Sequence, residues 1–447
     1  MMPVRHDTVA RSAREVDVLR EVDVVVAGGG AAGVAAAVCA ARAGASVVLL
    51  ERNGFLGGTM TSTSLGGICG LYSLIDGEPV QMVHGFAEEV RDRLDRAGGI
   101  RGALPWLQTA SLPYDLFIMK SVLDDLAETE RLTVLYQARL VEAGVEDGRI
   151  RHVIVRGRGG LFAIRANAFI DCTGDGELAA MAGVATEYDR ASLQFPTAMF
   201  RMGGVDTTVA MKVPRDEMHR LLEQAVTDGY DLPRTAGGIY SVRDGIVHLN
   251  ITKVKVDGHT PDTFDPIELS EAEREGRRQA RLYLEVFRRY VPGYANAYIL
   301  DTGAELGIRE TRRIVGPHVL TSDDVLKERK FDDAIAANCW PIEDHGGGRS
   351  TRWVWLSPGG YNHIPYRALL PMGVRNLLVA GRCLSSTHDA QAAIRVTANC
   401  FSTGQAAGLA AVMAGSGDMA SVDIKSLQAA LKAGGVNLAP MPETANA

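Results

Sequence analysis

The chain has 447 residues, of which 46% are hydrophobic and 23% are charged, a length sufficient for two or three globular domains. Its formal net charge is −7, so no basic surplus indicates a nucleic-acid partner. A transmembrane helix needs about eighteen consecutive apolar residues, and no such run occurs. The first twenty residues are charged and lack the apolar region of a secretory signal, which favours a cytoplasmic location.

Six cysteines are scattered along the chain, without C-x-x-C spacing and without a histidine at metal-ligand spacing. This distribution is typical of buried thiols in a reducing compartment, and it predicts no metal site. The six are Cys39, Cys69, Cys172, Cys339, Cys383 and Cys400.

Residues 22–52 predict a strand, a glycine-rich loop, a helix and a second strand, in that order. Residues 22–26 are mostly apolar and rich in β-branched side chains, as in a buried parallel strand. An alanine-rich helix follows the glycines and ends near Arg42, and residues 47–50 form the next strand.

The glycine spacing in this unit is that of a dinucleotide-binding loop. Gly28 allows a tight turn, Gly30 lets the backbone approach a pyrophosphate, and Gly33 lets the helix pack on the strand. Glu51 ends the second strand, where a carboxylate binds ribose hydroxyls and repels a 2′-phosphate, so FAD or NAD is favoured over NADP. The alternative is a βαβ unit whose glycines serve packing alone, which would not need this acid.

Small and hydroxyl-bearing residues follow over 53–70, a composition that lets backbone approach a ligand or forms a surface loop. Helices are predicted over 84–97 and 115–130, and a strand over 132–136.

A β-meander is predicted next, over 140–145, 150–155 and 161–166, with glycine turns between its strands. A separate strand over 168–172 then runs into Thr173-Gly174-Asp175-Gly176 and a short helix. This turn is typical of a second phosphate or ribityl contact, and the alternative is packing at a strand end.

Residues 186–370 have the composition of an inserted cap. Antiparallel strands are predicted over 195–202 and 246–256, and helices over 215–228 and 271–291. Ser270 with Glu273 forms a capping-box pattern for the second helix. Tyr283, Phe287 and Tyr290 lie on one face of that helix and are interpreted as core.

Arginine, histidine and tyrosine are concentrated at 305–317, 340–345 and 359–371. In an acidic chain this favours a site for an anionic or polar substrate. The alternative is that arginines such as Arg309 form structural ion pairs. The chain then returns to the first domain through a buried strand over 376–380, a loop to Asp389 and a small-residue helix over 397–414.

These segments resemble the FAD-dependent oxidoreductases of the glutathione-reductase type, and within them the FAD_oxidored group. The matching stretches include VVVAGGGAAGVAAAVCAARAGASVVLLER, FIDCTGDGELAAMAGV, PIEDH, HIPYRALLP and NLLVAGRCLSSTHDAQAAIRVTANC. The resemblance implies an α/β fold with a three-layer, Rossmann-like FAD-binding domain and an inserted mixed α+β cap. The implied boundaries are 15–185 and 370–415 for the discontinuous FAD domain, with a helical excursion at 76–130; 186–369 for the cap; and 416–447 for a C-terminal helix and tail.

The resemblance also implies which residues hold FAD. The pyrophosphate would be surrounded by Gly28, Gly30, Ala32 and Gly33, and the adenosine by Glu51, Arg52 and Leu140. The ribityl chain and flavin would lie beside Gly57, Gly58 and Thr59, and the second FAD-binding turn would consist of Thr173, Gly174 and Asp175. The ribityl and pyrophosphate would also meet Gly381 and Arg382, and the pyrimidine end of the flavin would meet Ile394, Arg395 and Val396. Arg382 stands where many such proteins have an acid, which weakens the role of its side chain.

For catalysis, His345 and His363 are the acid/base candidates, while Arg309 and Arg367, with Tyr366, would orient a carboxylate or carbonyl. The implied reaction is hydride transfer between flavin N5 and a small polar or anionic substrate. Its direction and the second electron carrier (oxygen, a quinone or a redox protein) stay open. The alternative is a flavin protein with a non-redox role, such as an isomerase, a hydratase or an RNA-modifying subunit, although the negative charge argues against RNA.

The sequence leaves two further properties open. Cys69, Tyr72 and His84 are candidate anchors for a covalent flavin, and no spacing selects among them. The oligomeric state is also open, and a homo-oligomer is compatible with the sequence.

Overall fold

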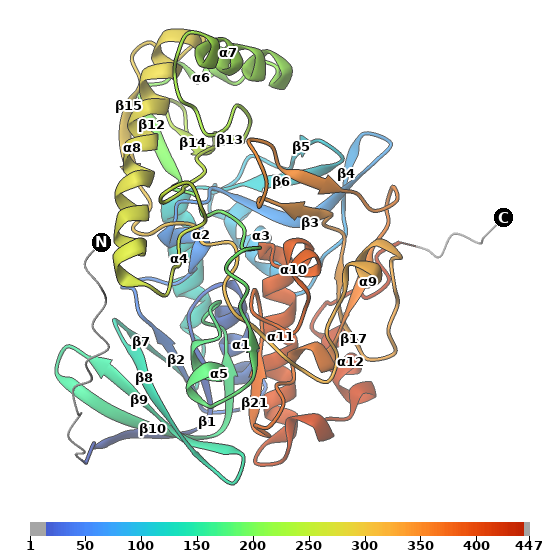
Figure 1. Cartoon of the computed structure of the whole chain (residues 1–447). Helices are drawn as coiled ribbons and strands as arrows, with labels where there is room; N and C mark the ends of the chain where they lie inside the picture. Colours follow the sequence, from blue (N-terminus) through green and yellow to red (C-terminus); the bar gives the residue numbers. More distant parts are fainter. Residues whose placement is uncertain (1–14, 442–447) are drawn as a thin grey trace.

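A parallel sheet organises the larger lobe, in the lower part of Figure 1, in a computed structural model that describes residues 15–441. Its strand order is β7-β2-β1-β10-β21. The strands are β1 (Val18–Ala27), β2 (Val47–Glu51), β7 (Leu132–Tyr136), β10 (Gly160–Asp171) and β21 (Leu377–Val379). This arrangement confirms the predicted Rossmann-like α/β core.

Both faces of the sheet are covered, which explains the continuous apolar run in β1. Val24 and Val26 face one core with the helices α1 (Ala31–Arg42) and α11 (Thr397–Ala414). Val25 and Ala27 face the other core, with residues of a β-meander. The layers are therefore helices, parallel sheet and meander.

The meander pairs β8 (Arg139–Glu146) with β9 (Arg149–Gly157), and β9 with the first half of β10. The prediction of two strands over 161–172 was wrong, because β10 is continuous. Its first half pairs with β9 and its second half pairs with β21 on the same edge. One strand thereby joins the meander to the parallel sheet.

Helices α1 and α11 lie side by side and meet backbone to backbone (Figure 1). A Cβ atom at Gly404 would stand 2.1 Å from the carbonyl oxygen of Ala32, and one at Gly408 would stand 2.3 Å from that of Ala36. Glycine is therefore required at both positions. The close approach aligns the N-terminal ends of the two helices at one edge of the sheet.

The segment predicted as a helical excursion contains a sheet as well as helices. Its sheet has the order β4-β3-β6-β5, and helices α3 and α4 pack beside it. The elements are α2 (Thr59–Ser62), β3 (Gly67–Ile75), β4 (Glu78–Gln81), α3 (Phe86–Arg96), β5 (Leu104–Trp106), β6 (Thr109–Pro113) and α4 (Leu116–Ala127).

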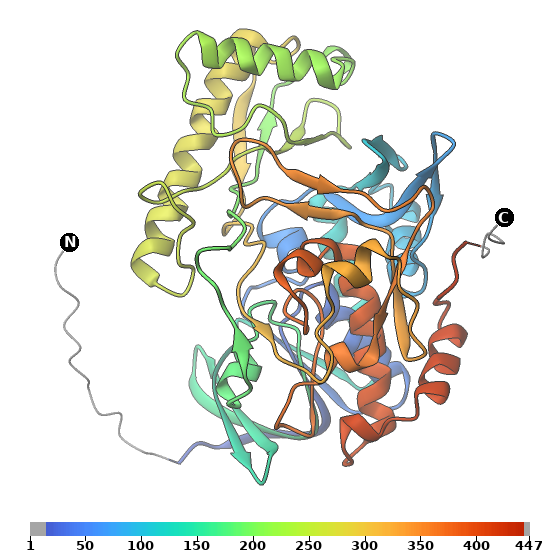
Figure 2. The same ribbon diagram turned by 45° about the vertical axis from the view of Figure 1, so that its right-hand side comes forward.

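A second lobe stands above the parallel sheet in Figures 1 and 2, with a core of its own. Its antiparallel sheet has the order β13-β14-β12-β15. The lobe comprises β12 (Phe200–Gly203), α6 (Thr207–Ala210), α7 (Arg215–Thr227), β13 (Gly238–Tyr240), β14 (Val247–Asn250), α8 (Pro266–Tyr290) and β15 (Tyr298–Thr302). Two of its strands are much shorter than predicted.

Helix α8 begins earlier than the sequence pattern predicted. Asp265 is its N-cap, accepting hydrogen bonds from the backbone N–H groups of Ile267 and Glu268. Ser270 lies inside the helix, where its hydroxyl donates to the Pro266 carbonyl. An aspartate followed by proline thus starts the helix instead of the serine.

The predicted cap, which ends at residue 369, does not pack as one unit. Residues from 320 onward pack largely in the core that contains α1 and α11 rather than in the second lobe. The elements of this part and its flanks are α5 (Glu177–Met181), β11 (Thr186–Glu187), β16 (Arg313–Ile314), α9 (Ser322–Leu326), β17 (Ala334–Asn338), β18 (Ile342–Asp344), β19 (Arg352–Val354), β20 (Asn362–Pro365) and η1 (Tyr366–Leu369).

The C-terminal part completes the main lobe. The predicted loop over 381–389 ends at Thr387, because helix α10 (His388–Ile394) begins just before Asp389; beyond α11 lie η2 (Met419–Ser421) and α12 (Ile424–Ala433). Residues 1–14 and 442–447 lie outside the described part of the structure. Most of the first twenty residues, for which no secretory signal was predicted, and the end of the predicted tail therefore lie outside it too.

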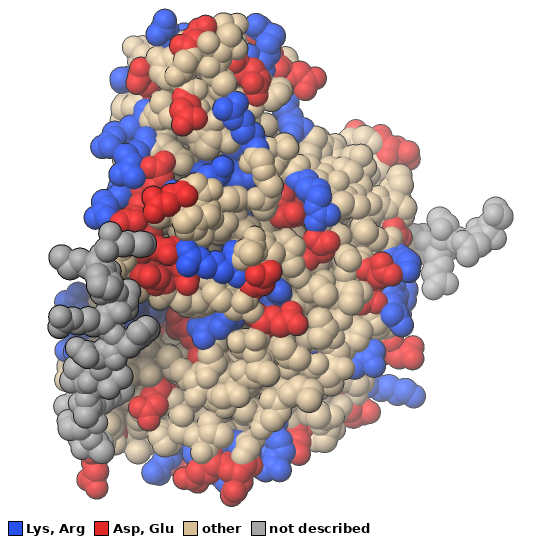
Figure 3. Space-filling model, viewed as in Figure 1, with Lys and Arg blue, Asp and Glu red and all other residues tan. Residues whose placement is uncertain are grey.

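Across residues 15–441, none of the helices combines the length and apolar character needed to span a bilayer. On the face drawn in Figure 3, acidic and basic side chains are interspersed.

We expect Gly408→Ala to destabilise the protein by about 2 kcal/mol, because the added methyl meets the Ala36 carbonyl across the helix contact. On an unconstrained helix the same change would stabilise by about 1 kcal/mol. Urea-unfolding midpoints measure the difference. Gly159→Ala is the control, since a Cβ there meets nothing within 4 Å. An unchanged or higher midpoint for Gly408→Ala would contradict the proposed contact.

Candidate active site

A cavity of about 1680 Å³, including its open mouth, lies at the carboxyl ends of the parallel strands. Ligands of open α/β sheets bind at this edge. Both lobes contribute to its walls. The predicted cofactor residues that line it are Gly28, Gly30, Ala32, Glu51, Arg52, Gly57, Thr59, Leu140, Thr173, Gly174, Asp175, Gly381, Arg382, Arg395 and Val396.

Three predicted cofactor residues do not line the cavity. A Cβ at Gly33 would lie 1.7 Å from the Gly28 carbonyl oxygen, so this glycine serves close packing of α1. Gly58 caps α2 with its backbone near Gly30, and Ile394 is buried in the core as the last residue of α10. These three residues contribute to packing and backbone placement around the cavity.

Glu51 is buried at the end of β2 and holds the glycine loop in place. Its Oε2 accepts a hydrogen bond from the Gly29 N–H at 2.8 Å, and its Oε1 accepts one from the Asn53 N–H at 2.7 Å. Burial raises the pKa of Glu51 against the effect of these bonds. Each carboxylate oxygen keeps a lone pair, which matches the predicted binding of ribose hydroxyls.

The turn after β10 is shaped by a second buried acid. Asp171 accepts hydrogen bonds from the Thr173 N–H at 3.0 Å, the Thr173 hydroxyl at 2.7 Å and the Ala179 N–H at 2.9 Å. This fixes Thr173-Gly174-Asp175 against the cavity.

Arg382 bonds to that turn and to the chain returning from the second lobe. Its Nε donates to the Gly174 carbonyl at 2.8 Å, and a terminal nitrogen lies 2.6 Å from an Asp175 carboxylate oxygen. The other terminal nitrogen donates to the Ile308 carbonyl. The arginine that replaces the usual acid thus has a structural role at this turn.

Two helix N-termini line the cavity without side-chain caps. Helix α1 begins after Gly30 and α11 after Val396, and neither N-cap residue supplies a side-chain acceptor. The free N–H groups and positive dipole ends suit a pyrophosphate or another anion. With Glu51 and the glycine loop, these groups fit a dinucleotide such as FAD.

A hydrogen-bonded chain of side chains crosses the end of the cavity nearest the second lobe. His345 lies 3.0 Å from Glu343 through Nε2 and 3.2 Å from the Thr351 hydroxyl through Nδ1. Arg234 donates to the same hydroxyl at 3.2 Å. This order assigns the imidazole proton to Nε2 and leaves Nδ1 as an acceptor.

The hydrogen-bonded side chains His345 and Glu343 differ in charge. Burial and the Arg309 guanidinium lower the pKa of His345 to about 3, so the ring is neutral at neutral pH. Glu343 also loses solvation, but the hydrogen bond from His345 and the charges of Arg395 and Arg309 outweigh this and keep its pKa below its usual range. Glu343 therefore stays ionised.

Three arginines line this end of the cavity: Arg234, Arg309 and Arg395. Arg309 donates to the Phe195 carbonyl at 2.7 Å and lies 3.3 Å from the Asn250 amide oxygen. Burial, followed by the charges of Arg395 and Arg234, lowers the pKa of Arg309 well below its usual range.

Within residues 15–441 none of these three arginines forms an ion pair with a carboxylate. The Nε of Arg395 is buried without a partner. The negative charge of Glu343 acts on all three guanidinium groups, and Glu310 acts on Arg395 as well. The site therefore carries excess positive charge.

The other predicted catalytic residues lie elsewhere. His363 is fixed by the Phe331 N–H and by the Leu438 carbonyl, and the Tyr366 hydroxyl donates to the Met419 carbonyl. Arg367 forms an exposed ion pair with Asp333. The predicted cluster is thus divided: His345 and Arg309 line the cavity, while His363, Tyr366 and Arg367 bind backbone or surface partners.

Of the three candidate flavin anchors, Cys69 lines the cavity and Tyr72 and His84 do not. Burial raises the pKa of the Cys69 thiol to about 12, which keeps it protonated and a weak nucleophile.

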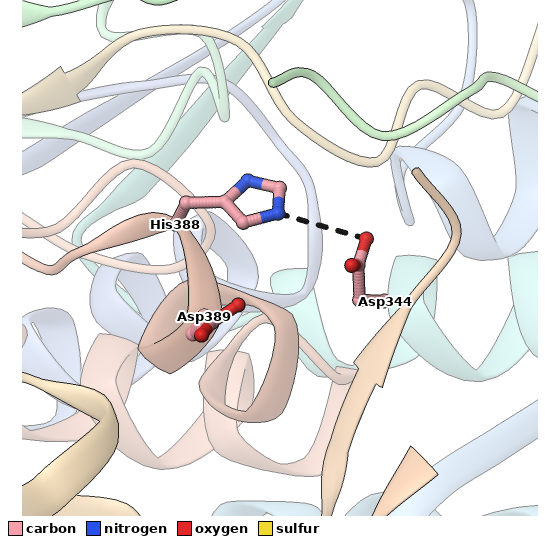
Figure 4. Close-up of side chains that lie close together, drawn as sticks. All are labelled: Asp344, His388 and Asp389. Atoms are coloured by element: carbon pink, nitrogen blue, oxygen red, sulfur yellow. Dashed lines mark ion pairs between the residues drawn. The ribbon is translucent and has the colours of Figure 1, made fainter. Parts of the chain in front are cut away.

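A cluster of metal-ligand types lies beside the site, formed by Asp344, His388 and Asp389 (Figure 4). Arg352 bonds to both aspartates, and His388 lies 2.8 Å from Glu310 on its other side. These ion pairs balance the carboxylates and bind the β18–β19 hairpin to α10.

Several residues that line the cavity were missed by sequence reasoning: Trp106, Arg234, Tyr240, Asn250, Trp340 and Glu343. Trp340 and Glu343 lie in WPIEDH, a stretch from which only His345 was selected. Arg234 lies in a loop that carries no local signal.

A profile of the family described as FAD dependent oxidoreductase matches residues 23–431. A search of curated protein sequences finds no match. Among solved structures, a geranylgeranyl bacteriochlorophyll reductase-like protein from Thermoplasma acidophilum is 13% identical, with a TM-score of 0.45, over 93% of this chain and 84% of that chain. The p-nitrophenol 4-monooxygenase PnpA from Pseudomonas putida is 12% identical, with a TM-score of 0.43, over 93% and 82%.

We expect Gly30→Val to fold normally but to bind its dinucleotide at least about tenfold more weakly. A Cβ at Gly30 meets only the Gly58 Cα, at 3.9 Å, so the added side chain enters the cavity at the predicted pyrophosphate position. Nucleotide released per chain on denaturation measures retention, with Gly159→Val as a control outside the cavity. Full retention in Gly30→Val would contradict this placement.

His388 should make stability depend on pH. The carboxylate of Asp344, at 3.6 Å, and the hydrogen bond to Glu310 raise its pKa to about 9, from about 6.5 in the unfolded chain. Its contribution is complete below about pH 6.5 and is lost as pH rises through 9. The difference in unfolding midpoint between the natural protein and His388→Gln should therefore shrink from pH 6 to pH 9.5. A constant difference would show that His388 is not protonated in the fold.

Proposed function

Because the chain belongs to the family of FAD-dependent oxidoreductases, we propose that it oxidises or reduces a small organic anion at the end of the cavity nearest the second lobe. The observation that carries this proposal is the excess positive charge of Arg234, Arg309 and Arg395 over Glu343. Buried cations without counterions are costly, and a bound carboxylate would offset that cost.

The residues at the sheet edge would hold FAD. The backbone of Gly28 to Gly30 would accommodate the pyrophosphate, Glu51 the adenosine ribose, and the N-terminus of α11 the pyrimidine end of the flavin. Bound FAD would supply the capacity to accept or donate a hydride.

The arginines would bind and orient the substrate. Arg309 is held by the Phe195 carbonyl and by Asn250, so its guanidinium needs little reorganisation to meet a carboxylate. A paired, charge-assisted interaction with a carboxylate would fix the reacting carbon relative to the cofactor edge of the cavity.

His345 would manage the substrate proton. Its Nε2–H donates to Glu343, which fixes the ring, and Nδ1 accepts from the Thr351 hydroxyl, so a substrate proton would reach the ring through that hydroxyl. A bound anion would reduce the positive potential that lowers the pKa of His345, and it would thereby make the ring a stronger base. Glu343 would stabilise the imidazolium that results.

The test is anaerobic reduction of the FAD-loaded protein by a panel of small hydroxy, amino and saturated acids. The flavin absorbance measures the reduction. We expect at least one acid to bleach the flavin, or its unsaturated counterpart to reoxidise chemically reduced protein. Arg309→Gln should raise the half-saturating concentration by about tenfold to a hundredfold, since a charged hydrogen bond is lost from a buried site.

Arg367→Gln is the matched control, because that arginine came from the same sequence prediction and lies outside the cavity. It should leave the half-saturating concentration unchanged. A flavin that no acid reduces and no unsaturated acid reoxidises, in protein with full FAD content, would contradict the redox proposal. Equal behaviour of the two variants would contradict the role of Arg309.

A further inference from the structure

All four tryptophans of the chain gather at the end of the cavity nearest the second lobe. Trp106 of β5 and Trp340 line the cavity, with ring centroids 6.4 Å apart and planes 8° from parallel. Trp353 stands edge-on to both, and Trp355 stacks on Trp353 at 5.2 Å. Tyr240 lines the cavity as well. We call Trp106, Trp340 and Tyr240 the aromatic wall.

The aromatic wall is bonded to the cationic side of the site. Trp340 Nε1 donates to Glu343 Oε2 at 3.1 Å, and the other oxygen of Glu343 accepts from His345. His345 and Arg234 meet at the Thr351 hydroxyl. One chain of hydrogen bonds thus fixes an indole plane relative to a buried guanidinium.

These two features select among anions. An inorganic anion would satisfy the arginines and would make no use of the aromatic wall. A saturated acid would fill apolar space without matching flat rings. A planar, conjugated acid satisfies both the arginines and the aromatic wall. Contacts between aromatic rings add a favourable interaction energy to the free energy gained by burying apolar surface.

We propose that the substrate is a planar conjugated carboxylate, with the carboxylate bound by Arg234 and Arg309 and its plane against the aromatic wall. This inference rests on the proposed function, since it names the substrate class of the same site. Conjugation also keeps the unsaturated carbons in the plane of the carboxylate. Binding of the carboxylate therefore fixes the orientation of the rest of the molecule.

Binding of three simple probes to FAD-loaded protein tests the proposal without turnover. Benzoate is planar and charged, cyclohexanecarboxylate is charged but not planar, and benzamide is planar but uncharged. We expect calorimetry to give benzoate a dissociation constant about threefold to tenfold below that of cyclohexanecarboxylate, and more than tenfold below that of benzamide. Benzoate should also change the tryptophan fluorescence and the flavin absorbance.

Two variants divide the proposal into its parts. Trp106→Leu should remove the preference for benzoate over cyclohexanecarboxylate, and Arg234→Gln should remove the preference over benzamide. Trp355→Leu is the control for Trp106, because Trp355 belongs to the same cluster and does not line the cavity. It should keep both preferences.

Failure of this inference differs from failure of the proposed function. Equal affinities for benzoate and cyclohexanecarboxylate would overturn the planar class, even if saturated acids reduce the flavin. A clear benzoate preference that Trp106→Leu removes would support the planar site, even if no acid reduces the flavin. Absence of binding by both acids would overturn the carboxylate site itself.

Discussion

The contact between α1 and α11 determines where the cavity lies. Gly404 and Gly408 let α11 approach the carbonyl groups of Ala32 and Ala36, so the two helices run together over one face of the sheet. Their N-termini consequently open into the same cavity, one beside the glycine loop and the other beside Arg395. Two dipole ends then bias one cavity toward negative groups. A wider separation of the helices would divide it.

The chemistry at the other end follows from the kind of hydrogen-bond partners that the arginines have. Neutral acceptors, namely the Phe195 carbonyl, the Asn250 amide and the Thr351 hydroxyl, satisfy the guanidinium groups of Arg309 and Arg234 without neutralising them. Carboxylate partners would have given a more stable site and one less able to bind an anion. Arg313 shows the contrast, because it forms a buried ion pair with Glu310. The same residue type is thus structural in one place and available for binding in the other.

The cofactor end could be predicted from the sequence because its signals are local. Glycine spacing, strand periodicity and the terminal Glu51 all lie within one βαβ unit, and the cavity does pass along them. The end nearest the second lobe could be predicted only in part. His345 and Arg309 were predicted, whereas Trp106, Arg234 and Glu343 come from three distant segments. His345 and His363 look equivalent in sequence, and only tertiary packing directs His363 to the Phe331 N–H and the Leu438 carbonyl. The prediction that Ser270 caps α8 was also wrong, because Asp265, a second local capping signal, is the N-cap of that helix.

The chain order of the cavity walls has a consequence for biosynthesis. Residues near 28, 174 and 381 meet at one edge of the sheet, and Arg382 joins the middle group to the last. Strand β21 and helix α11, which complete that edge, leave the ribosome after nearly all of the preceding chain. At about 5–20 residues per second, the second lobe is synthesised well before the nucleotide site is complete. Insertion of FAD at the proposed site would therefore wait until β21 and α11 have been synthesised, and the growing chain must protect an unfinished sheet edge until then.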